Sequence, residues 1–206
     1  MYYDTPALRF YWEKIDGLPF RRKLRIRCYG DAAGVSPTGT VHVEIKQRVN
    51  RVTQKRRLEM PYEQAGSLCG GSPTPFDDPL SQEIRGLVAG MSLMPTAIVG
   101  YQREALVGGL FDPGVRVTFD TRVRGRDRDL RFGASNAANR YVIDPSMAVL
   151  EVKVDDRVPS WITALVANHG LRTTRLSKYC RTIDVFGRAP RSLLYQPEEA
   201  VHNVGV

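Results

Sequence analysis

Polar and apolar residues alternate over much of the chain, which is the pattern of β-strands with one buried face. The alternation is clearest in FRRKLRIRCY and TVHVEIKQRV, which are separated by the loop GDAAGVSPTG. A second loop, GGSPTPFDDP, is also rich in Gly, Pro, Ser and Asp. The pattern predicts strands over residues 20–29, 40–49, 50–60, 96–107, 115–124 and 149–154.

Other segments place apolar residues at helical spacing. Residues 79–91 carry them near every 3.6 positions, behind a proline in a favourable first position. Similar patterns predict helices over 62–68, 159–169 and 176–186. The strands follow one another in hairpins and do not alternate strictly with helices, so we predict an α+β fold and not a Rossmann fold.

The predicted strands each have one charged face. Residues two apart share a face, so Lys23, Arg25 and Arg27 project together, opposite Leu24 and Ile26. The same rule places an acid and a base on one face in each of two ExK motifs, Glu44 with Lys46 and Glu151 with Lys153. It also predicts a polar face between residues 116 and 124, formed by Arg116, Thr118, Asp120, Arg122 and Arg124.

Two interpretations of these faces are open. The charged sides can face bulk water, as in any antiparallel sheet with one buried side. Alternatively, the sheet closes into a barrel and the charged sides line its lumen. A carboxylate two residues from a lysine suits a site that holds a divalent cation and a phosphate together.

Length and composition narrow the class of protein. The chain has 206 residues, 42% of them hydrophobic and 25% charged, which fits one globular domain with its own core. It contains no apolar run long enough for a membrane helix, and its polar start is no signal peptide. Three widely spaced cysteines indicate neither a disulfide framework nor a zinc site. We therefore expect a cytoplasmic protein.

The charge points to a polyanionic partner. The net charge is +8, and residues 1–60 carry 13 basic and 6 acidic residues. Arginine supplies 24 of the 30 cations, and its planar fork binds phosphate oxygens in pairs. Nucleic acid, anionic lipid and phosphate chains all fit this composition.

A family resemblance separates these options. The segments YDTPALRFYWEKIDGLPFRRKLRIRCYG, VHVEIKQRVNRVTQKRR, YQREAL, VRVTFDTRV, LEVKV and LSKY occur in this order. In this arrangement they resemble the VTC-type polyphosphate polymerase domain of the triphosphate tunnel metalloenzymes, in the CYTH-like superfamily. The resemblance covers residues 1–186 and leaves 187–206 as a C-terminal tail.

The resemblance implies a fold, an activity and a set of site residues. The fold is an eight-stranded antiparallel β-tunnel with flanking helices, and the activity is transfer of the ATP γ-phosphate onto a growing polyphosphate chain with Mn²⁺ or Mg²⁺. The implied metal ligand is Glu151, with Glu44 as a weaker candidate. The implied phosphate-binding residues are Arg25, Arg27, Lys46, Arg103, Arg116, Arg175 and Lys178, of which Lys46, Arg103, Arg116 and Lys178 are the catalytic candidates.

One departure from the family pattern bears on catalysis. The family's first tunnel strand, with alternating acidic and basic residues, precedes YDTP, whereas this chain starts at Met1. Either the start codon is assigned too late or the tunnel lacks a wall, which would breach a lumen that must exclude water. The alternatives to a polymerase are therefore a polyphosphate-binding module without activity and a hydrolase of tripolyphosphate or nucleoside triphosphates.

Nucleic acid is not expected as a partner. The chain has no helix-turn-helix, RNP or zinc-finger spacing, and its basic residues alternate within strands. It also lacks the GK[ST] of a phosphate-binding loop and a GxGxxG that opens a helix. The expected ligands are ATP, triphosphate or polyphosphate.

Overall fold

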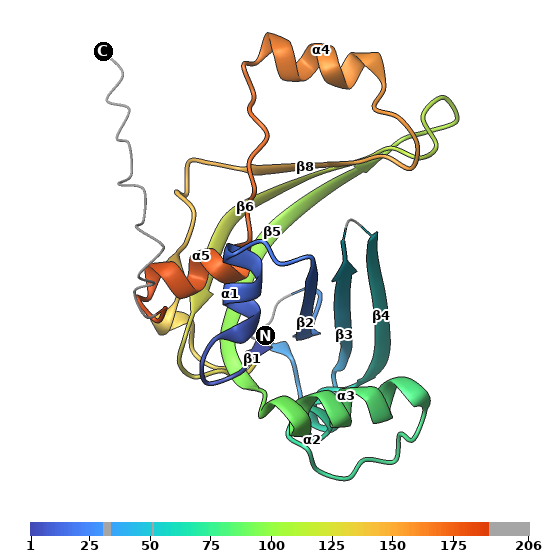
Figure 1. Cartoon of the computed structure of the whole chain (residues 1–206). Coiled ribbons are helices and arrows are strands. Elements are labelled where there is room, and N and C mark those ends of the chain that lie inside the picture. Colours follow the sequence, from blue (N-terminus) through green and yellow to red (C-terminus); the bar gives the residue numbers. More distant parts are fainter. Residues whose placement is uncertain (31–33, 51, 190–206) are drawn as a thin grey trace.

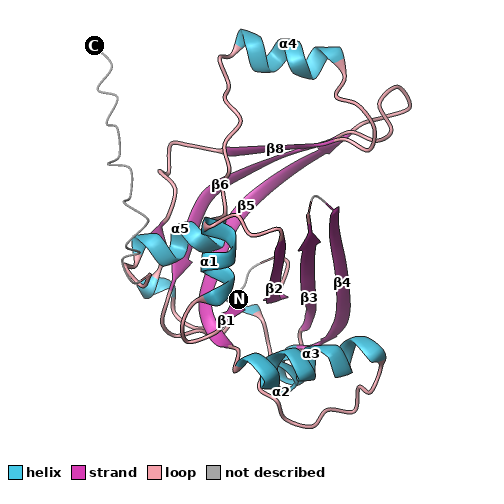
Figure 2. Ribbon diagram, in the orientation of Figure 1, coloured by secondary structure: helices cyan, strands magenta, loops and turns pink. Residues whose placement is uncertain are grey.

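A computed structural model describes residues 1–30, 34–50 and 52–189 (Figure 1). It contains one eight-stranded antiparallel sheet and five α-helices, which confirms the predicted α+β class and strand number (Figure 2). The elements are β1 (Tyr2–Asp4), α1 (Arg9–Ile15), β2 (Phe20–Arg27), β3 (Thr40–Val49), β4 (Val52–Pro61), α2 (Tyr62–Cys69), α3 (Pro79–Met91), β5 (Met94–Val107), β6 (Arg116–Arg126), β7 (Arg140–Tyr141), β8 (Val149–Lys153), α4 (Ser160–Asn168) and α5 (Lys178–Val185).

The strand order runs β4-β3-β2-β1-β5-β6, and two short strands share the far side of β6. Strand β8 pairs with the first half of β6, and β7 pairs with its second half. Strands β5 and β6 bend away from the upright β2–β4 strands (Figure 1). No pairing joins β4 to β8 within the described part of the chain, so the sheet is curled and open.

The outer face of the sheet carries the main core. Leu24 and Ile26 of β2 are fully buried there, as their alternation with charged residues predicts. Ile45 of β3, Leu68 of α2 and Ile84 of α3 belong to the same apolar cluster. Helices α2 and α3 therefore cover the apolar side of β2–β4, and the charged side is left facing the concave interior.

The predicted helices are confirmed, with ends that differ by one or two residues. Helix α3 begins at Pro79, because the Asp78 side chain accepts hydrogen bonds from the backbone N–H groups of Leu80 and Ser81. None of the helices in the described residues is long and apolar enough to cross a bilayer.

Two N-terminal elements, β1 and α1, escaped the sequence analysis. Asp4 is the last residue of β1, is fully buried, and accepts hydrogen bonds from the backbone N–H groups of Phe10 and Tyr11 at 2.8 and 3.0 Å. It thereby satisfies the first turn of α1, where Leu8 offers no side-chain cap. The Tyr179 hydroxyl of α5 also donates to Asp4, at 2.5 Å. One carboxylate thus joins β1, α1 and α5.

The predicted polar face between residues 116 and 124 is wrong beyond Asp120. The β5–β6 register shifts between Gly100 and Gln102, and Arg122 takes a left-handed conformation with φ 49°. Such a bulge changes which side of the sheet the following residues face. Arg122 is consequently exposed, and Arg124 contacts Tyr141 instead of the residues that line the concave interior.

Candidate functional site

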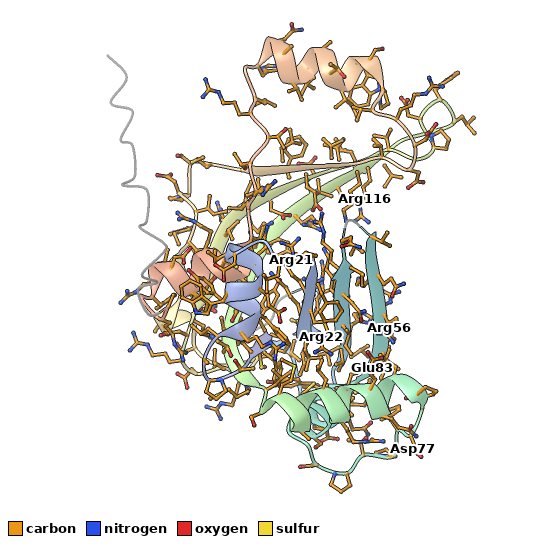
Figure 3. All side chains as sticks on the ribbon, in the orientation of Figure 1. Arg21, Arg22, Arg56, Asp77, Glu83 and Arg116 are labelled. Atoms are coloured by element: carbon orange, nitrogen blue, oxygen red, sulfur yellow. The ribbon has the colours of Figure 1, made fainter. Side chains whose placement is uncertain are left out.

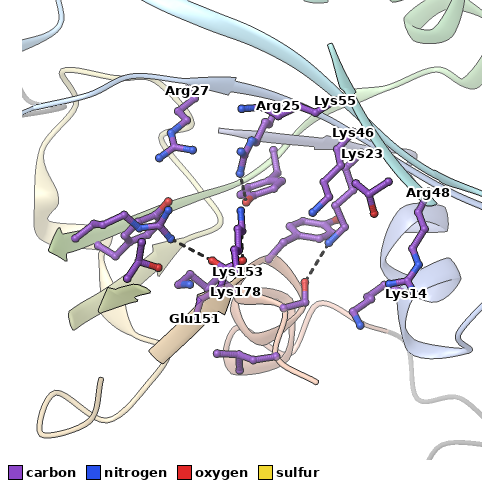
Figure 4. A pocket seen from close by; sticks show the side chains of 18 of the residues that line it. Lys14, Lys23, Arg25, Arg27, Lys46, Arg48, Lys55, Glu151, Lys153 and Lys178 are labelled. Atoms are coloured by element: carbon purple, nitrogen blue, oxygen red, sulfur yellow. Dashed lines mark hydrogen bonds and ion pairs between the residues drawn. The ribbon is translucent and has the colours of Figure 1, made fainter. Parts of the chain in front are cut away.

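A cavity of about 700 Å³, here called the main cavity, lies in the concave face of the sheet. Strands on both sides line it, and the start of α5 forms its floor (Figure 4). Thirteen of the 22 lining residues are Lys or Arg, and one is a carboxylate. The cations are Lys14, Arg21, Lys23, Arg25, Arg27, Lys46, Arg48, Lys55, Arg57, Arg103, Arg116, Lys153 and Lys178.

One side of the main cavity, the cationic wall, consists of the charged faces of β2, β3 and β4. Lys46 lies opposite Lys23 on one neighbouring strand and opposite Lys55 on the other. Like charges directly opposite in a sheet destabilise it. Burial lowers the pKa of Lys46, and the charges of Lys23 and Arg25 lower it further. This wall therefore gains from an anion placed against it.

Glu44 balances part of the charge of the cationic wall. Its carboxylate is 1% exposed and lies 2.6 Å from Arg25 Nη2 and 2.7 Å from Lys55 Nζ. Burial opposes the charge on Glu44, but Lys55 and Arg25 outweigh burial and hold its pKa below the usual range. Both oxygens are engaged and Glu44 does not line the cavity, so its geometry fits a structural ion pair better than a metal ligand.

The opposite side, the mixed wall, comes from β5, β6 and β8. Here the fully buried Asp120 lies 2.5 Å from Arg103 Nε and 2.5 Å from Lys178 Nζ. The hydrogen bond from Arg103 and the pairing with Lys178 overcome burial and depress the pKa of Asp120. Asp120 thus holds one cation of the sheet and one cation of α5 beside each other.

Glu151 is the carboxylate that lines the main cavity. Its side chain is 44% exposed and lies 3.7 Å from Arg103 Nη2 and 3.6 Å from Lys153 Nζ. These distances exceed those of direct hydrogen bonds, so its oxygens remain available. No cluster of three metal-ligating side chains exists among the described residues. A Mg²⁺ or Mn²⁺ ion suits such a place only as a partner of one carboxylate and of phosphate oxygens.

Four tyrosine rings support cations in the main cavity. Arg25 lies over Tyr2, Lys23 over Tyr179 and Arg27 over Tyr29, each 4.5 to 5.8 Å from the ring centroid. Arg103 and Lys178 both lie near Tyr101, at 5.1 and 5.0 Å. Tyr2 and Tyr179 also stack on each other. The ring faces of these tyrosines therefore contact the cations of the main cavity and help to hold them in place.

The structure brings most of the predicted site residues together. Seven of the nine line the main cavity, namely Arg25, Arg27, Lys46, Arg103, Arg116, Lys178 and Glu151. Arg175 lines a neighbouring cavity, and Glu44 is buried within the cationic wall against Arg25 and Lys55. The geometry places these residues, while their roles in binding and catalysis stay predictions.

Several lining residues were not predicted as site residues. Lys55 and Arg57 belong to the run QKRRLE on β4, where alternate side chains point to opposite faces of the sheet. Arg56, between them, therefore points outward to Glu83 of α3, with Arg56 Nη2 2.7 Å from Glu83 Oε1 (Figure 3). This alternation in the sequence could have identified Lys55 and Arg57 as cavity residues. Lys14 had no such signal, because its position depends on α1. Asp120 lies behind the lining residues, and alternation placed it on the polar face of its strand without predicting its pairing with Lys178.

Comparison with known families agrees with this geometry. The family model described as the VTC domain matches residues 1–186. A search of curated proteins found no match. Because the family model spans nine tenths of the chain, we conclude that this protein belongs to the VTC domain family, whose functions concern polyphosphate.

Proposed function

We propose that this chain binds polyphosphate or triphosphate in the main cavity and transfers the γ-phosphoryl group of ATP onto a growing phosphate chain. The observation that carries the proposal is the ratio of thirteen cations to one carboxylate around a single cavity. A cavity of this charge needs a ligand with a negative charge on every unit and little apolar surface. A phosphate chain has both properties.

The two walls suit different parts of the reaction. Lysines of the cationic wall that form no ion pair with a carboxylate among the described residues, such as Lys23 and Lys46, provide charge along the length of a bound chain. Arg103 and Lys178, which Asp120 holds in place, provide fixed donors at one point. Fixed donors stabilise the charge that develops as a phosphoryl group moves, and this stabilisation supplies most of the catalysis in phosphoryl transfer.

In the proposed step, a terminal oxygen of the phosphate chain attacks the γ-phosphorus of ATP. The bond from that phosphorus to the β–γ bridging oxygen breaks, and ADP leaves with the electron pair. Glu151 would hold Mn²⁺ or Mg²⁺, which neutralises charge on the phosphate oxygens when bound. Arg116 and Lys153 lie opposite each other next to Glu151 and would bind the same phosphate groups.

A second candidate function rests on the open sheet. Strand β4 does not pair with β8 in the described residues, so the main cavity is accessible to water from that side. Water can then take the place of the phosphate chain as nucleophile, and the same residues would hydrolyse tripolyphosphate or nucleoside triphosphates. The same cavity without turnover would be a binding module.

One assay separates these functions. Purified protein is incubated with ATP and Mn²⁺, and phosphate chains, orthophosphate and ADP are quantified. Chain growth with equimolar ADP supports the polymerase, and orthophosphate release without chains supports the hydrolase. Binding of tripolyphosphate, measured by calorimetry, without either product supports the binding module. Absence of tripolyphosphate binding would contradict all three.

A further inference from the structure

A second cavity of about 620 Å³ adjoins the main cavity. Its walls come from the segment between α1 and β2, from the β3–β4 turn at Asn50, and from α5 with the residues before it. The two cavities share lining residues, namely Lys14, Arg21, Arg48, Leu176 and Ser177. They are therefore neighbouring parts of one surface that runs from the sheet to the end of α1.

The second cavity is also basic. Five cations line it, against a single carboxylate, Asp184, which accepts a hydrogen bond of 2.6 Å from the Tyr11 hydroxyl. Within the described ranges none of the five cations forms an ion pair with a carboxylate. These cations are Lys14, Arg21, Arg48, Arg175 and Arg181.

The junction of the two cavities concentrates charge. Arg21 lies directly opposite Arg48 on the neighbouring strand, a like-charge pair that costs stability unless an anion bridges it. Burial lowers the pKa of Lys14, and the charges of Arg21, Lys23 and Arg175 add to this effect. Figure 4 shows Lys14 and Arg48 together at one end of the main cavity, with Arg27 toward the other end. The row of cations thus continues out of the main cavity without an acidic interruption.

We propose that the second cavity is a subsite for the continuation of a long phosphate chain, so that one polyphosphate molecule occupies both cavities through Lys14, Arg21 and Arg48. This inference rests on the proposed function, because it requires a phosphate chain in the main cavity. It adds a preference: the protein favours polyphosphate over tripolyphosphate, whose three phosphates fit within the main cavity alone.

The test uses Arg181, which lines the second cavity and not the main one and is not among the phosphate-binding residues that the family resemblance implies. Arg181 is exposed, so Arg181→Glu should leave the fold intact. We expect the dissociation constant for long-chain polyphosphate to rise about five- to tenfold, as expected when an exposed charge contact is reversed. The dissociation constant for tripolyphosphate should change less than about twofold. Isothermal titration calorimetry on the full chain measures both.

A matched control reverses one charge elsewhere. Arg128 is exposed and lines neither cavity, so Arg128→Glu should leave both dissociation constants unchanged. A control effect as large as that of the test variant would contradict the subsite, since net charge alone would explain the result. Thermal melts of both variants verify folding.

The remaining outcomes distinguish this inference from the proposed function. If wild type binds both ligands and the test variant binds long chains with unchanged affinity, the subsite is wrong and the proposed function stands. A second equivalent of tripolyphosphate that disappears in the test variant, with long-chain binding unchanged, would mean that the second cavity holds a separate anion. If wild type binds neither ligand, the proposed function fails and the subsite with it.

Discussion

The two walls of the main cavity hold similar numbers of strands but balance their charge differently. In the cationic wall, the one buried carboxylate, Glu44, is paired with Arg25 and Lys55, and Lys23 and Lys46 have no acidic partner among the described residues. The mixed wall places Asp120 and Glu151 beside its cations. The first arrangement attracts an anion along its whole length, while the second fixes a few donors in place. Binding and chemistry are thus expected to separate between the walls.

Breaking the mixed wall should have the largest effect. In Asp120→Ala the cations of Arg103 and Lys178 lose their shared carboxylate, whose side chain is 0% exposed. Removal of one partner from a buried ion pair costs about 3 kcal/mol, the low end of the range, because both cations keep some access to water. Urea denaturation measures the loss. Asp155→Ala is the control, at an exposed carboxylate, and an equal free energy of unfolding for Asp120→Ala and wild type would contradict this role.

The cationic wall should respond in the opposite manner. Lys23→Gln/Lys46→Gln removes two charges that repel each other, so the free energy of unfolding should stay equal or rise slightly. Tripolyphosphate binding should weaken at least about tenfold, since each charged contact contributes about 1.5 kcal/mol or more. Calorimetry and denaturation test the two parts on the same sample.

The conservative pair Lys23→Arg/Lys46→Arg keeps both charges and should retain most of the affinity. A loss of affinity as large as that of the glutamine pair would show that shape at these positions, and not charge, determines binding. Unfolding of the glutamine pair would contradict the placement of Lys23 and Lys46 on the cavity side.

A smaller and more specific effect is expected at Glu151. If this carboxylate holds Mn²⁺, then Glu151→Gln should abolish the tightening of tripolyphosphate binding that Mn²⁺ produces, a change of several fold. Metal-free binding should stay equal or improve slightly, because a negative charge leaves the cavity. The exposed Asp156 offers a control, Asp156→Asn. Equal Mn²⁺ dependence in Glu151→Gln and wild type would contradict the assignment.

The smallest predicted effect is a pH dependence of binding. The pKa of Lys46 is lowered by burial first and then by Lys23 and Arg25, and a bound phosphate chain raises it again. Lys46 in the free protein therefore loses its proton at a lower pH than in the complex. Affinity should be full below the free-state pKa and fall as the pH rises from there toward 10.5, the ordinary value for lysine.

Lys46→Arg keeps the charge at all these pH values and should flatten the profile. The ratio of wild-type to variant affinity at each pH cancels the titration of the ligand itself. Parallel profiles would mean that Lys46 does not titrate in this range.

Local patterns predicted the strands and the cavity side of β2 because the alternation of Leu24 and Ile26 with charged residues is strict. The same pattern failed beyond Asp120, where a bulge at Arg122 interrupts it. A bulge depends on the pairing with β5, and single-strand alternation contains no information about that pairing.

Site residues that belong to the family motifs could be predicted from the sequence. Site residues whose positions depend on contacts between distant segments could not. Arg175 lies only three residues before Lys178, yet the two line different cavities, because α5 begins between them. Asp120 appeared as one polar residue among others on a strand. Its importance follows from Lys178, which lies 58 positions later in the chain. The spacing of residues in the sequence does not predict such a contact.

The hydrogen bond from Tyr179 to Asp4 has a consequence for synthesis. The two residues lie 175 positions apart, so a ribosome completes nearly the entire described chain before Asp4 obtains this donor. Until then Asp4 has no phenol donor and the cavity has no floor. Closure over so long a stretch of sequence is slow, because contacts between distant residues must overcome a larger loss of chain entropy.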